Sequence, residues 1–335
     1  MIPANDSLIQ RSTKPRLSVV VPCYNEDAVL PMLRPRLLSV LDSLGSVWEV
    51  LIVDDGSTDR TLETAIEMHE EDSRFKIIAL SRNFGHQAAI SAGLHYSVGD
   101  VVAVLDADLQ DPPEVLAECL NRWRDGYDVV YAIRKKRREG ALLRASYAAF
   151  YRLLKAVADI KIPLDSGDFC VMDRQVVNAL LAMPERNMFV RGMRAWSGFR
   201  QIGVAYERAA RAAGATKYPF LSLVRLAVDG ILSFSTLPLR VATLLGGATI
   251  LLNMLVLMFV VVWRVLGFEF MGHTARELPG WAGGLSVTLL LGGVQLFILG
   301  VVGEYIARIY DEVKQRPRWI VRGVLGVSQP ERRAE

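Results

Sequence analysis

Apolar and polar positions form two distinct patterns along the first 134 residues. Short runs of Val, Ile and Leu predict buried strands, whereas apolar residues that recur every three or four positions predict helices with one buried face. The predicted strands lie within 16–26, 48–59, 75–83, 100–108 and 127–134. The predicted helices lie within 26–45, 60–74 and 87–99. A further helix is expected after Asp111, with Asp111 as its N-cap and Pro112 and Pro113 in its first turn.

Strands that alternate with helices predict an α/β domain with a mostly parallel sheet and helices on both faces. In sheets of this kind, ligands bind beyond the carboxyl ends of the strands. The polar residues that follow the predicted strands therefore form the candidate site.

Two uninterrupted apolar runs lie in the last third of the chain, at 241–262 and 281–303, and neither contains a charged residue. About 20 apolar residues cross a hydrocarbon core of about 30 Å as an α-helix. We expect two transmembrane helices and hence a lipid bilayer as a partner. Two buried helices of a soluble protein are the alternative.

The flanks of these runs predict their orientation. Five basic residues lie within 208–240 and five within 308–322, whereas 263–280 carries two basic and two acidic residues. The positive-inside rule places both termini in the cytoplasm and the short link outside. The N-terminal segment has no apolar signal-peptide core, so the α/β domain is expected to stay in the cytoplasm.

These patterns divide the chain into seven parts. They are a tail (1–15), a cytoplasmic α/β domain (16–207), juxtamembrane interfacial helices (208–240), a transmembrane helix (241–263), an external loop (264–280), a second transmembrane helix (281–307) and a cytoplasmic tail (308–335). Residues 217–234 resemble an amphipathic interfacial helix, with a soluble packing helix as the alternative. The three cysteines have no metal-binding spacing and suit a reducing compartment. A dispersed net charge of +3 gives no argument for nucleic acid.

The stretch VAVLDADLQDPP, residues 102–113, ends a predicted strand in carboxylates. Side chains alternate along an extended segment, so Asp106, Asp108 and Gln110 are expected to point to one side. Two carboxylates and an amide oxygen form a hard oxygen site that suits Mg²⁺ or Mn²⁺, with a diphosphate completing the shell. The alternative is that these acids only cap a helix and solvate a turn.

Polar residues also follow the first three predicted strands. Tyr24 suits stacking on a base, and Glu26, Asp54 or Asp55 suit hydrogen bonds from a base or a ribose. Each of them alone is equally typical of an ordinary turn. Together with the acidic stretch, they indicate a nucleotide whose diphosphate lies on a metal ion. Arg82 is a further candidate contact to the donor, with a role in its loop as the alternative.

Six motifs occur in order along the chain: PxYNE, VDDGSxD, SRNFGxxxAxxAGL, DADLQDPPE, SGDFxxMDR and GxTKYP. Together they resemble family 2 glycosyltransferases of the GT-A fold. Within this family the chain is similar to polyisoprenyl-phosphate glycosyltransferases, such as bactoprenol glucosyltransferases and dolichyl-phosphate mannose synthases, over about residues 16–310.

The resemblance implies a GT-A catalytic domain and a nucleotide-sugar donor. It implies that a polyisoprenyl phosphate takes the sugar, with inversion at the anomeric carbon, at a bacterial inner membrane. The metal would be held by Asp106 and Asp108, with Gln110 close by. The nucleotide would contact Pro22, Tyr24, Glu26, Asp54, Asp55, Arg82 and Asp106.

Basic residues beyond the predicted strands are candidates for binding the acceptor phosphate, because guanidinium pairs and a glycine-flanked Thr–Lys suit an anion. The candidates are Arg144, Arg191, Arg194, Arg211, Thr216 and Lys217. The alternative is that they are solvated surface residues or juxtamembrane anchors.

A phosphate acceptor needs no general base, because its second pKa of about 6 leaves a nucleophilic oxyanion at neutral pH. The protein is therefore expected to position two anions and stabilise the departing diphosphate. The expected catalytic residues are Asp108, Asp168 and Arg134. Related inverting transferases place a base at the position of Asp168, and here this residue either has that role or orients the acceptor or a basic neighbour.

The favoured reaction is transfer of glucose from UDP-glucose to undecaprenyl phosphate, which gives a lipid-phosphate-sugar donor for modification of cell-envelope glycans. UDP-N-acetylglucosamine, UDP-formyl-aminoarabinose and GDP-mannose stay open as donors. Two spans, and RGMRAW in place of a QxxRW motif, disfavour a processive polysaccharide synthase. The intact acids disfavour a non-catalytic membrane subunit. Glycine pairs in both spans suit close helix packing and a homo-oligomer, although apolar helices often contain such pairs.

Overall fold

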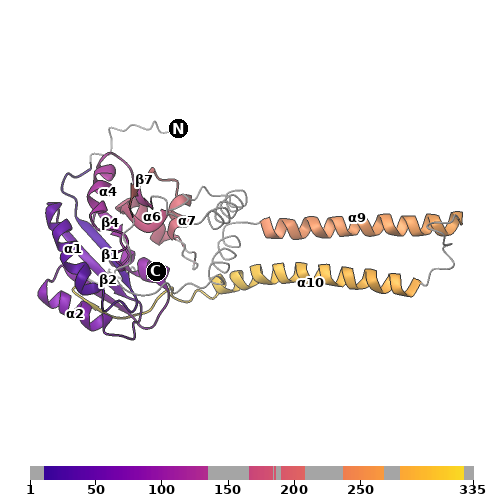
Figure 1. Cartoon of the computed structure of the whole chain (residues 1–335), viewed down its shortest axis with the longest axis horizontal. Helices are drawn as coiled ribbons and strands as arrows, with labels where there is room; N and C mark the ends of the chain where they lie inside the picture. The colour runs from indigo at the N-terminus through magenta and orange to yellow at the C-terminus, as the bar shows by residue number, and fades with distance from the viewer. Residues whose placement is uncertain are drawn as a thin grey trace. The chain divides into compact units, whose positions relative to one another are not determined.

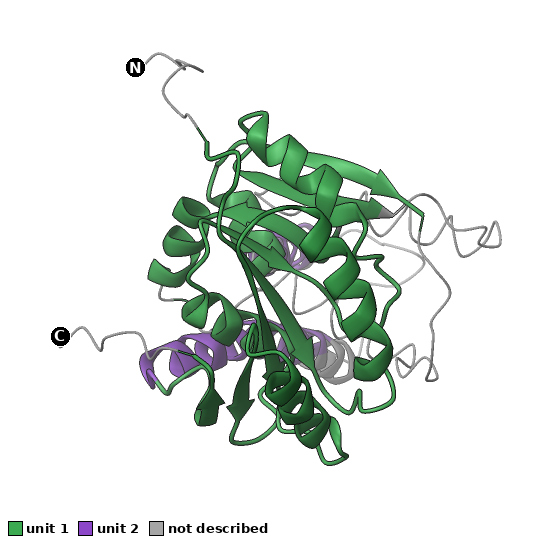
Figure 2. Cartoon of the chain, turned by 90° about the vertical axis from the view of Figure 1, so that its left-hand side faces the viewer, with its two compact units in different colours: residues 1–155, 160–218, 316–335 green, residues 156–159, 219–315 purple. Residues whose placement is uncertain are grey.

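The computed structural model describes residues 11–134, 166–183, 185, 190–207, 237–267 and 280–327. The chain forms two compact units (Figures 1 and 2). The first contains residues 1–155, 160–218 and 316–335, and the second contains residues 156–159 and 219–315.

The first unit is built on one eight-stranded sheet with the order β7-β5-β6-β4-β1-β2-β3-β8. Its strands are β1 (Leu17–Cys23), β2 (Trp48–Asp54), β3 (Phe75–Leu80), β4 (Val101–Val104), β5 (Val129–Arg134), β6 (Ser166–Asp173), β7 (Gln201–Tyr206) and β8 (Val321–Leu325). Neighbouring pairs among β1 to β4 are parallel, as is the pair β5–β7, whereas β6 and β8 are antiparallel to their neighbours. The prediction of a mostly parallel α/β sheet is confirmed.

Helices cover both faces of this sheet. They are α1 (Leu30–Ser43), α2 (Thr61–Glu71), α3 (His86–Tyr96), α4 (Val115–Arg124), α6 (Arg174–Ala182) and α7 (Val190–Trp196). The buried residues of α1, α2 and α4 share one hydrophobic cluster, and those of α3, α6 and α7 share the other. Because β1 alternates Val19 and Val21 toward the first cluster with Val20 toward the second, both faces of the central strand are buried.

Helix α1 shows how the apolar pattern directs packing. Leu30, Leu33, Leu37 and Leu41 recur at helical spacing, and all four are buried against the sheet. The sequence predicted an irregular start because of its two prolines, but the helix accommodates both, with Pro35 inside it.

Three strands lie where no element was predicted from the sequence. Strand β6 pairs antiparallel with β4 and β5. Strand β7 extends the sheet beyond β5. Strand β8 lies in the segment interpreted as a C-terminal tail, and it pairs antiparallel with β3.

The second unit contains α9 (Leu237–Leu266) and α10 (Gly280–Val313). In the described part of this unit, two stretches are long and apolar enough to cross a membrane: Val241–Trp263 and Leu290–Val313. Most of their described side chains are exposed, which is typical of surfaces that face lipid. The predicted interfacial helix at 217–234 lies outside the described residues.

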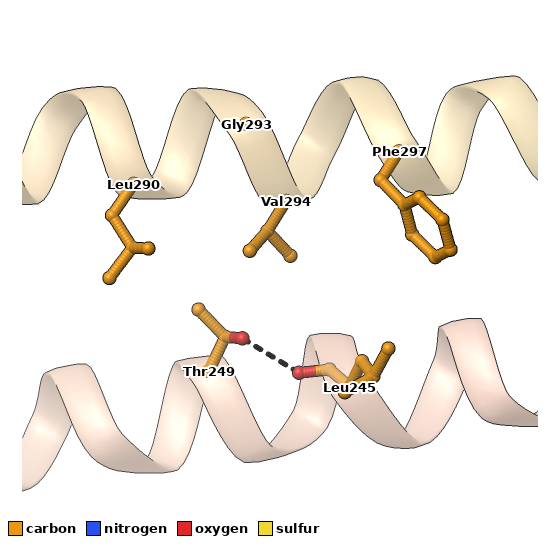
Figure 3. A pocket seen from close by; sticks show the side chains of 6 residues that line it. All are labelled: Leu245, Thr249, Leu290, Gly293, Val294 and Phe297. Atoms are coloured by element: carbon orange, nitrogen blue, oxygen red, sulfur yellow. Dashed lines mark hydrogen bonds between the residues drawn. The ribbon is translucent and has the colours of Figure 1, made fainter.

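A hollow between α9 and α10 is apolar in character (Figure 3). It is lined by Leu245, Thr249, Leu290, Gly293, Val294 and Phe297. The Thr249 hydroxyl donates to the Leu245 carbonyl at 2.7 Å, so its hydrogen is used within the helix. This hollow has no group for acid–base or metal chemistry.

We expect Glu49→Gln to lower the free energy of unfolding by about 1–3 kcal/mol at neutral pH, because the largely buried ammonium of Lys76 loses the carboxylate that pairs with it. The Glu49 carboxylate is buried 2.7 Å from Lys76 Nζ, and accepts hydrogen bonds from the Ser18 hydroxyl and the Val98 N–H. Burial opposes ionisation, but these three contacts together hold its pKa below the usual value. Urea unfolding of the full chain in detergent, followed by tryptophan fluorescence, measures the loss.

The sign of the pH effect follows from the lowered pKa. The contribution of Glu49 is present above the pKa of the unfolded chain, about 4.3, and is lost as the pH falls through the lower folded pKa. The gap between wild type and Glu49→Gln should therefore close in acid. Glu67→Gln is the control, because Glu67 pairs with Arg60 at an exposed site and should change the stability by less than about 1 kcal/mol. Equal losses in the two variants would contradict the prediction.

Candidate active site

The loops that follow β1 and β2 are bonded to each other at the carboxyl edge of the sheet. The Asn25 amide donates to the Ser57 hydroxyl at 3.0 Å, and the Asn25 side-chain oxygen accepts from the Thr58 amide at 2.9 Å. The Glu26 amide donates to the Thr61 hydroxyl at 2.7 Å. Two loops that are far apart in sequence therefore form one platform.

The loop after β3 joins this platform through Gly56. Gly56 has a positive φ of 66°, and a Cβ there would lie 2.4 Å from the Arg82 carbonyl carbon. Only glycine allows this conformation together with this approach. The third loop therefore packs directly on the second.

Asp55 holds the start of α3. Its carboxylate accepts the backbone N–H of Phe84 at 2.7 Å and that of Gly85 at 2.9 Å. Burial raises the pKa of Asp55, although these two N–H groups counteract the effect. Both oxygens are engaged in the protein, which favours a role in positioning the loop. Asp54, also buried, accepts from the Ser57 amide at 3.2 Å.

The acidic stretch after β4 is a turn, because β4 ends at Val104 and Leu109 has a φ of 57°. The expectation of an extended segment is wrong. The burial still alternates, with Ala107 and Leu109 in the core and Asp106, Asp108 and Gln110 partly exposed. The Asp108 carboxylate accepts the Gln110 amide at 3.1 Å.

The prediction that Asp111 caps a helix is also wrong. Asp111 is buried and accepts a hydrogen bond from the hydroxyl of buried Tyr206 in β7. Helix α4 begins at Val115 with Glu114 as its N-cap, after Pro112 and Pro113. A tertiary hydrogen bond has prevailed over the local capping preference.

Asp168 in β6 is the most heavily bonded acid at this edge. Arg191 donates to it through Nε at 2.8 Å and through Nη2 at 3.0 Å. The Gln87 amide nitrogen lies 3.3 Å away, and His86 Nε2 lies 3.2 Å away. The carboxylate is buried, so these donors replace the water it would otherwise bind.

The pKa values of Asp106 and Asp168 are shifted in opposite directions. Burial raises the pKa of Asp106 to about 6, and nearby carboxylates add repulsion that His86 only partly offsets. Burial also acts on Asp168, but hydrogen bonds from His86 and Arg191 outweigh it and hold its pKa far below the usual value. Partial burial opposes the charge on His86, yet Asp168 and Asp106 raise its pKa overall. Asp168 is therefore an anion with little tendency to accept a proton.

Asp106 is the residue whose surroundings best fit a metal ion. Its Oδ1 is buried and accepts no hydrogen bond in the described structure, although His86 Nε2 lies 3.4 Å from it. A carboxylate oxygen left without a donor in a buried position is costly unless a cation satisfies it. Together with Asp108 it offers two hard oxygen donors. The described residues contain no cluster of three His, Cys, Asp or Glu side chains able to hold a metal.

The remaining predicted contacts to the nucleotide differ in exposure. Tyr24 is 43% exposed, which leaves its ring open to a partner. Pro22 is buried within β1, and Glu26 is partly exposed. Arg82 is exposed, with its guanidinium 4.1 Å from the Phe84 ring centre.

The predicted phosphate-binding residues are only partly described. Arg191 contacts Asp168 and is one-third exposed, whereas Arg194 is buried 5.3 Å from the Tyr131 ring centre. The Arg134 backbone ends β5, and its side chain lies outside the described structure. Arg144, Arg211, Thr216 and Lys217 lie outside it as well.

Two residues of this site were missed by the sequence analysis. His86 contacts Asp106 and Asp168, and Gln87 links Asp168 to the amide of Val190 at 3.0 Å. Both follow the loop after β3, within the SRNFGHQ stretch. Their position at the carboxyl end of a strand was the one available signal.

Comparisons with known proteins agree with the resemblance to family 2 glycosyltransferases that the motifs indicated. Residues 18–181 match a sequence model of "Glycosyl transferase family 2". The chain is 45% identical over 316 residues to "Uncharacterized glycosyltransferase YkcC" of Bacillus subtilis (strain 168), covering 93% of this chain and 94% of that protein. It is 37% identical over 308 residues to "Bactoprenol glucosyl transferase" of Shigella phage SfII, covering 92% and 97%.

Among solved structures, the chain is similar to the mannosyltransferase PcManGT from Pyrobaculum calidifontis in complex with GDP-Man and Mn²⁺. The identity is 16% and the TM-score is 0.45, with 89% of this chain and 88% of that chain covered.

We expect Gly56→Ala to destabilise the chain by more than Gly45→Ala, in thermal unfolding of the full chain. Both glycines have a positive φ, which costs an alanine about 1–2 kcal/mol. A Cβ at Gly45 meets nothing within 4 Å, whereas at Gly56 it meets the Arg82 backbone. Equal losses in the two variants would show that the loops do not pack as described.

Proposed function

Because the chain belongs to glycosyltransferase family 2, we propose that it transfers glucose from UDP-glucose to undecaprenyl phosphate, with inversion at the anomeric carbon. The name of the phage SfII relative, similar over nearly its full length, supports both the sugar and the lipid acceptor. The product would serve as a lipid-linked sugar donor for cell-envelope glycans.

The observation that carries the proposal is the pairing of two different acidic centres at one edge of the sheet. Asp106 has an unsatisfied buried oxygen, which suits a cation on a diphosphate. Asp168 is held by Arg191, which brings a guanidinium to the same edge. One centre suits the donor and the other suits an anionic acceptor.

The donor would lie over the loop platform. Tyr24 offers an exposed ring to a base, and Glu26 lies beside it. Pro22 is the second-last residue of β1, and Asp54 is the last residue of β2. Asp55 acts through the loop before α3, and Arg82 is an exposed cation for the diphosphate or its sugar.

Mg²⁺ or Mn²⁺ would be held by Asp106 and Asp108, with Gln110 nearby, and when bound it would neutralise negative charge on the departing diphosphate. Burial and repulsion from neighbouring carboxylates raise the pKa of Asp106, and a bound cation would relieve both effects on the anionic form.

On the acceptor side, we propose that Arg191 contacts the phosphate and that Asp168 orients this guanidinium. The two hydrogen bonds from Arg191 to Asp168 fix the plane of the guanidinium. Its remaining N–H groups would then donate hydrogen bonds to a phosphate in a fixed direction. Further contacts are proposed for Arg134, Arg144, Arg194, Arg211, Thr216 and Lys217, from their sequence context alone.

The chemistry then requires little proton transfer. An oxygen of the lipid phosphate forms a bond to the anomeric carbon as the bond from that carbon to the diphosphate breaks, and UDP leaves with the electron pair. The phosphate oxygen is already anionic at neutral pH, so no base is needed. The chain's contribution is to hold the two anions in line.

We further propose that α9 and α10 cross the bilayer and that the first unit lies in the cytoplasm. Both helices contain a stretch that is long and apolar enough to cross a membrane. Basic residues precede the first stretch, within 208–240, and lie within 308–322 at the end of the second. Helix packing through the glycine pairs at 246–247 and 292–293 would support a homo-oligomer.

The test is transfer to lipid by the full chain. Membranes that contain the protein are incubated with undecaprenyl phosphate and radiolabelled UDP-glucose, UDP-N-acetylglucosamine, UDP-formyl-aminoarabinose or GDP-mannose, and the lipid is extracted. We expect label in lipid from UDP-glucose, in a product labile to mild acid. Label from another donor alone would overturn the sugar assignment, and no label from any donor would overturn the reaction.

We expect Asp108→Asn to lower metal-dependent transfer by more than about 100-fold, since loss of a metal ligand exceeds the 10–100-fold cost of losing its supporting contacts. The asparagine oxygen still accepts from the Gln110 amide, so the turn is kept. The matched control is Asp100→Asn at the opposite end of β4, where the Asp100 carboxylate accepts a hydrogen bond from the Arg16 amide at 2.9 Å. Normal turnover by Asp108→Asn would refute the metal assignment.

A further inference from the structure

Strands β4 and β6 create a charge problem at the edge of the sheet. Their antiparallel pairing ends at Val104 and Cys170; Asp106, two residues after Val104, lies in the turn that follows β4, and Asp168 lies two residues before Cys170 in β6. Both carboxylates lie within 3.4 Å of the same ring nitrogen, His86 Nε2, so two like charges are held close together and oppose each other's ionisation. Both carboxylates are largely buried, so water screens their repulsion poorly.

His86 lies between these two acids. Its Nε2 is 3.2 Å from Asp168 Oδ2 and 3.4 Å from Asp106 Oδ1. One ring nitrogen therefore faces a carboxylate from β6 and a carboxylate from the turn after β4. Arg191 and Gln87 contact Asp168 from the remaining sides.

The backbone fixes where this ring stands. His86 is the first residue of α3, directly after Gly85, whose φ of 99° turns the chain into the helix. Asp55 accepts the amides of Phe84 and Gly85, which holds that turn to the end of β2. The imidazole is thus presented from the rigid start of a helix.

We propose that His86 is a positioning residue that holds Asp106 of the donor side and Asp168 of the acceptor side at a fixed separation, so that cleavage of the sugar nucleotide is coupled to transfer. The inference rests on the proposed function. The proposal concerns the position of Nε2 between the two carboxylates.

A purely structural role fits the ring less well. The His86 side chain is 44% exposed, so removing it opens no cavity in the core. Asp168 keeps its hydrogen bonds from Arg191 and Gln87 without it. The distinctive loss is the single contact that joins the two carboxylates.

The test compares His86→Ala with His86→Gln in the full chain in detergent micelles. A misplacement of reacting groups by about 1 Å costs on the order of 100-fold in rate, so His86→Ala should lower transfer from UDP-glucose to undecaprenyl phosphate by about 10–100-fold. Affinity for UDP with Mn²⁺, measured by calorimetry, should change by less than about 3-fold. Hydrolysis of UDP-glucose per sugar transferred should rise.

His86→Gln should restore most of the coupling. The Gln side-chain amide places an N–H donor at about the reach of Nε2, and it has no charge to titrate. His95→Ala is the matched control, because His95 lies in the last turn of the same helix, is exposed, and has ring contacts only to Tyr96 and Trp319 in the described structure. It should leave transfer, hydrolysis and UDP affinity at wild-type values.

The outcomes separate the two proposals. If the wild-type chain transfers no sugar to undecaprenyl phosphate, the proposed function fails. If the wild type is active and His86→Ala transfers at the same rate, the positioning role fails. If both His86 variants lose UDP binding together with transfer, or melt well below His95→Ala, the residue is structural and the inference is overturned.

Discussion

Antiparallel pairing of β6 with β4 is the constraint on which the rest of this site depends. A parallel sheet gathers carboxylates at one edge, and the reversed strand β6 brings Asp168 close to Asp106 in the turn after β4, with His86 Nε2 within 3.4 Å of both. Two largely buried acids that share a neighbour are tolerable only with cations or N–H donors around them. Arg191, Gln87 and His86 contact Asp168, whereas Asp106 Oδ1 has the His86 contact but no hydrogen bond in the described structure. Asp106 Oδ1 can therefore accept a metal ion, whereas the Asp168 carboxylate is already neutralised by its donors.

The loops after β1, β2 and β3 have no hydrophobic core of their own, so contacts between neighbouring loops must fix their conformation. Asn25 ties the first loop to the second, and Gly56 lets the third loop touch the second through backbone atoms. Asp55 then fixes the turn into α3. Because each contact involves the backbone of a neighbouring loop, the exposed Tyr24 stands on a rigid base. Rigid support of this kind reduces the entropy cost of binding a flexible ligand.

The sequence predicted the first five strands and the helices between them, because both follow from local apolar patterns. Each strand is a short apolar run, and each helix has apolar residues on one face. Strand β6 escaped prediction because its reversed place between β4 and β5 is set by residues distant in sequence. Asp106 and Asp108 were predicted as metal ligands from their position after a strand, and this stays a prediction. His86 was not found, since no local pattern reports which carboxylates its ring will meet. Asp111 was misread because a capping rule cannot foresee Tyr206.

Strand β8 has a consequence for how the protein can be handled. The segment that follows α10 in sequence enters the sheet at Leu80, where the Ser81 amide donates to the Ile320 carbonyl at 2.8 Å, and it then pairs with β3 from Leu80 to Ile77. Shortening the chain to remove this segment would bare a row of backbone amides and carbonyls on an apolar strand, which is a template for aggregation. A fragment that stops before α9 would lack this cover, so residues 316–327 would have to be supplied again by fusion.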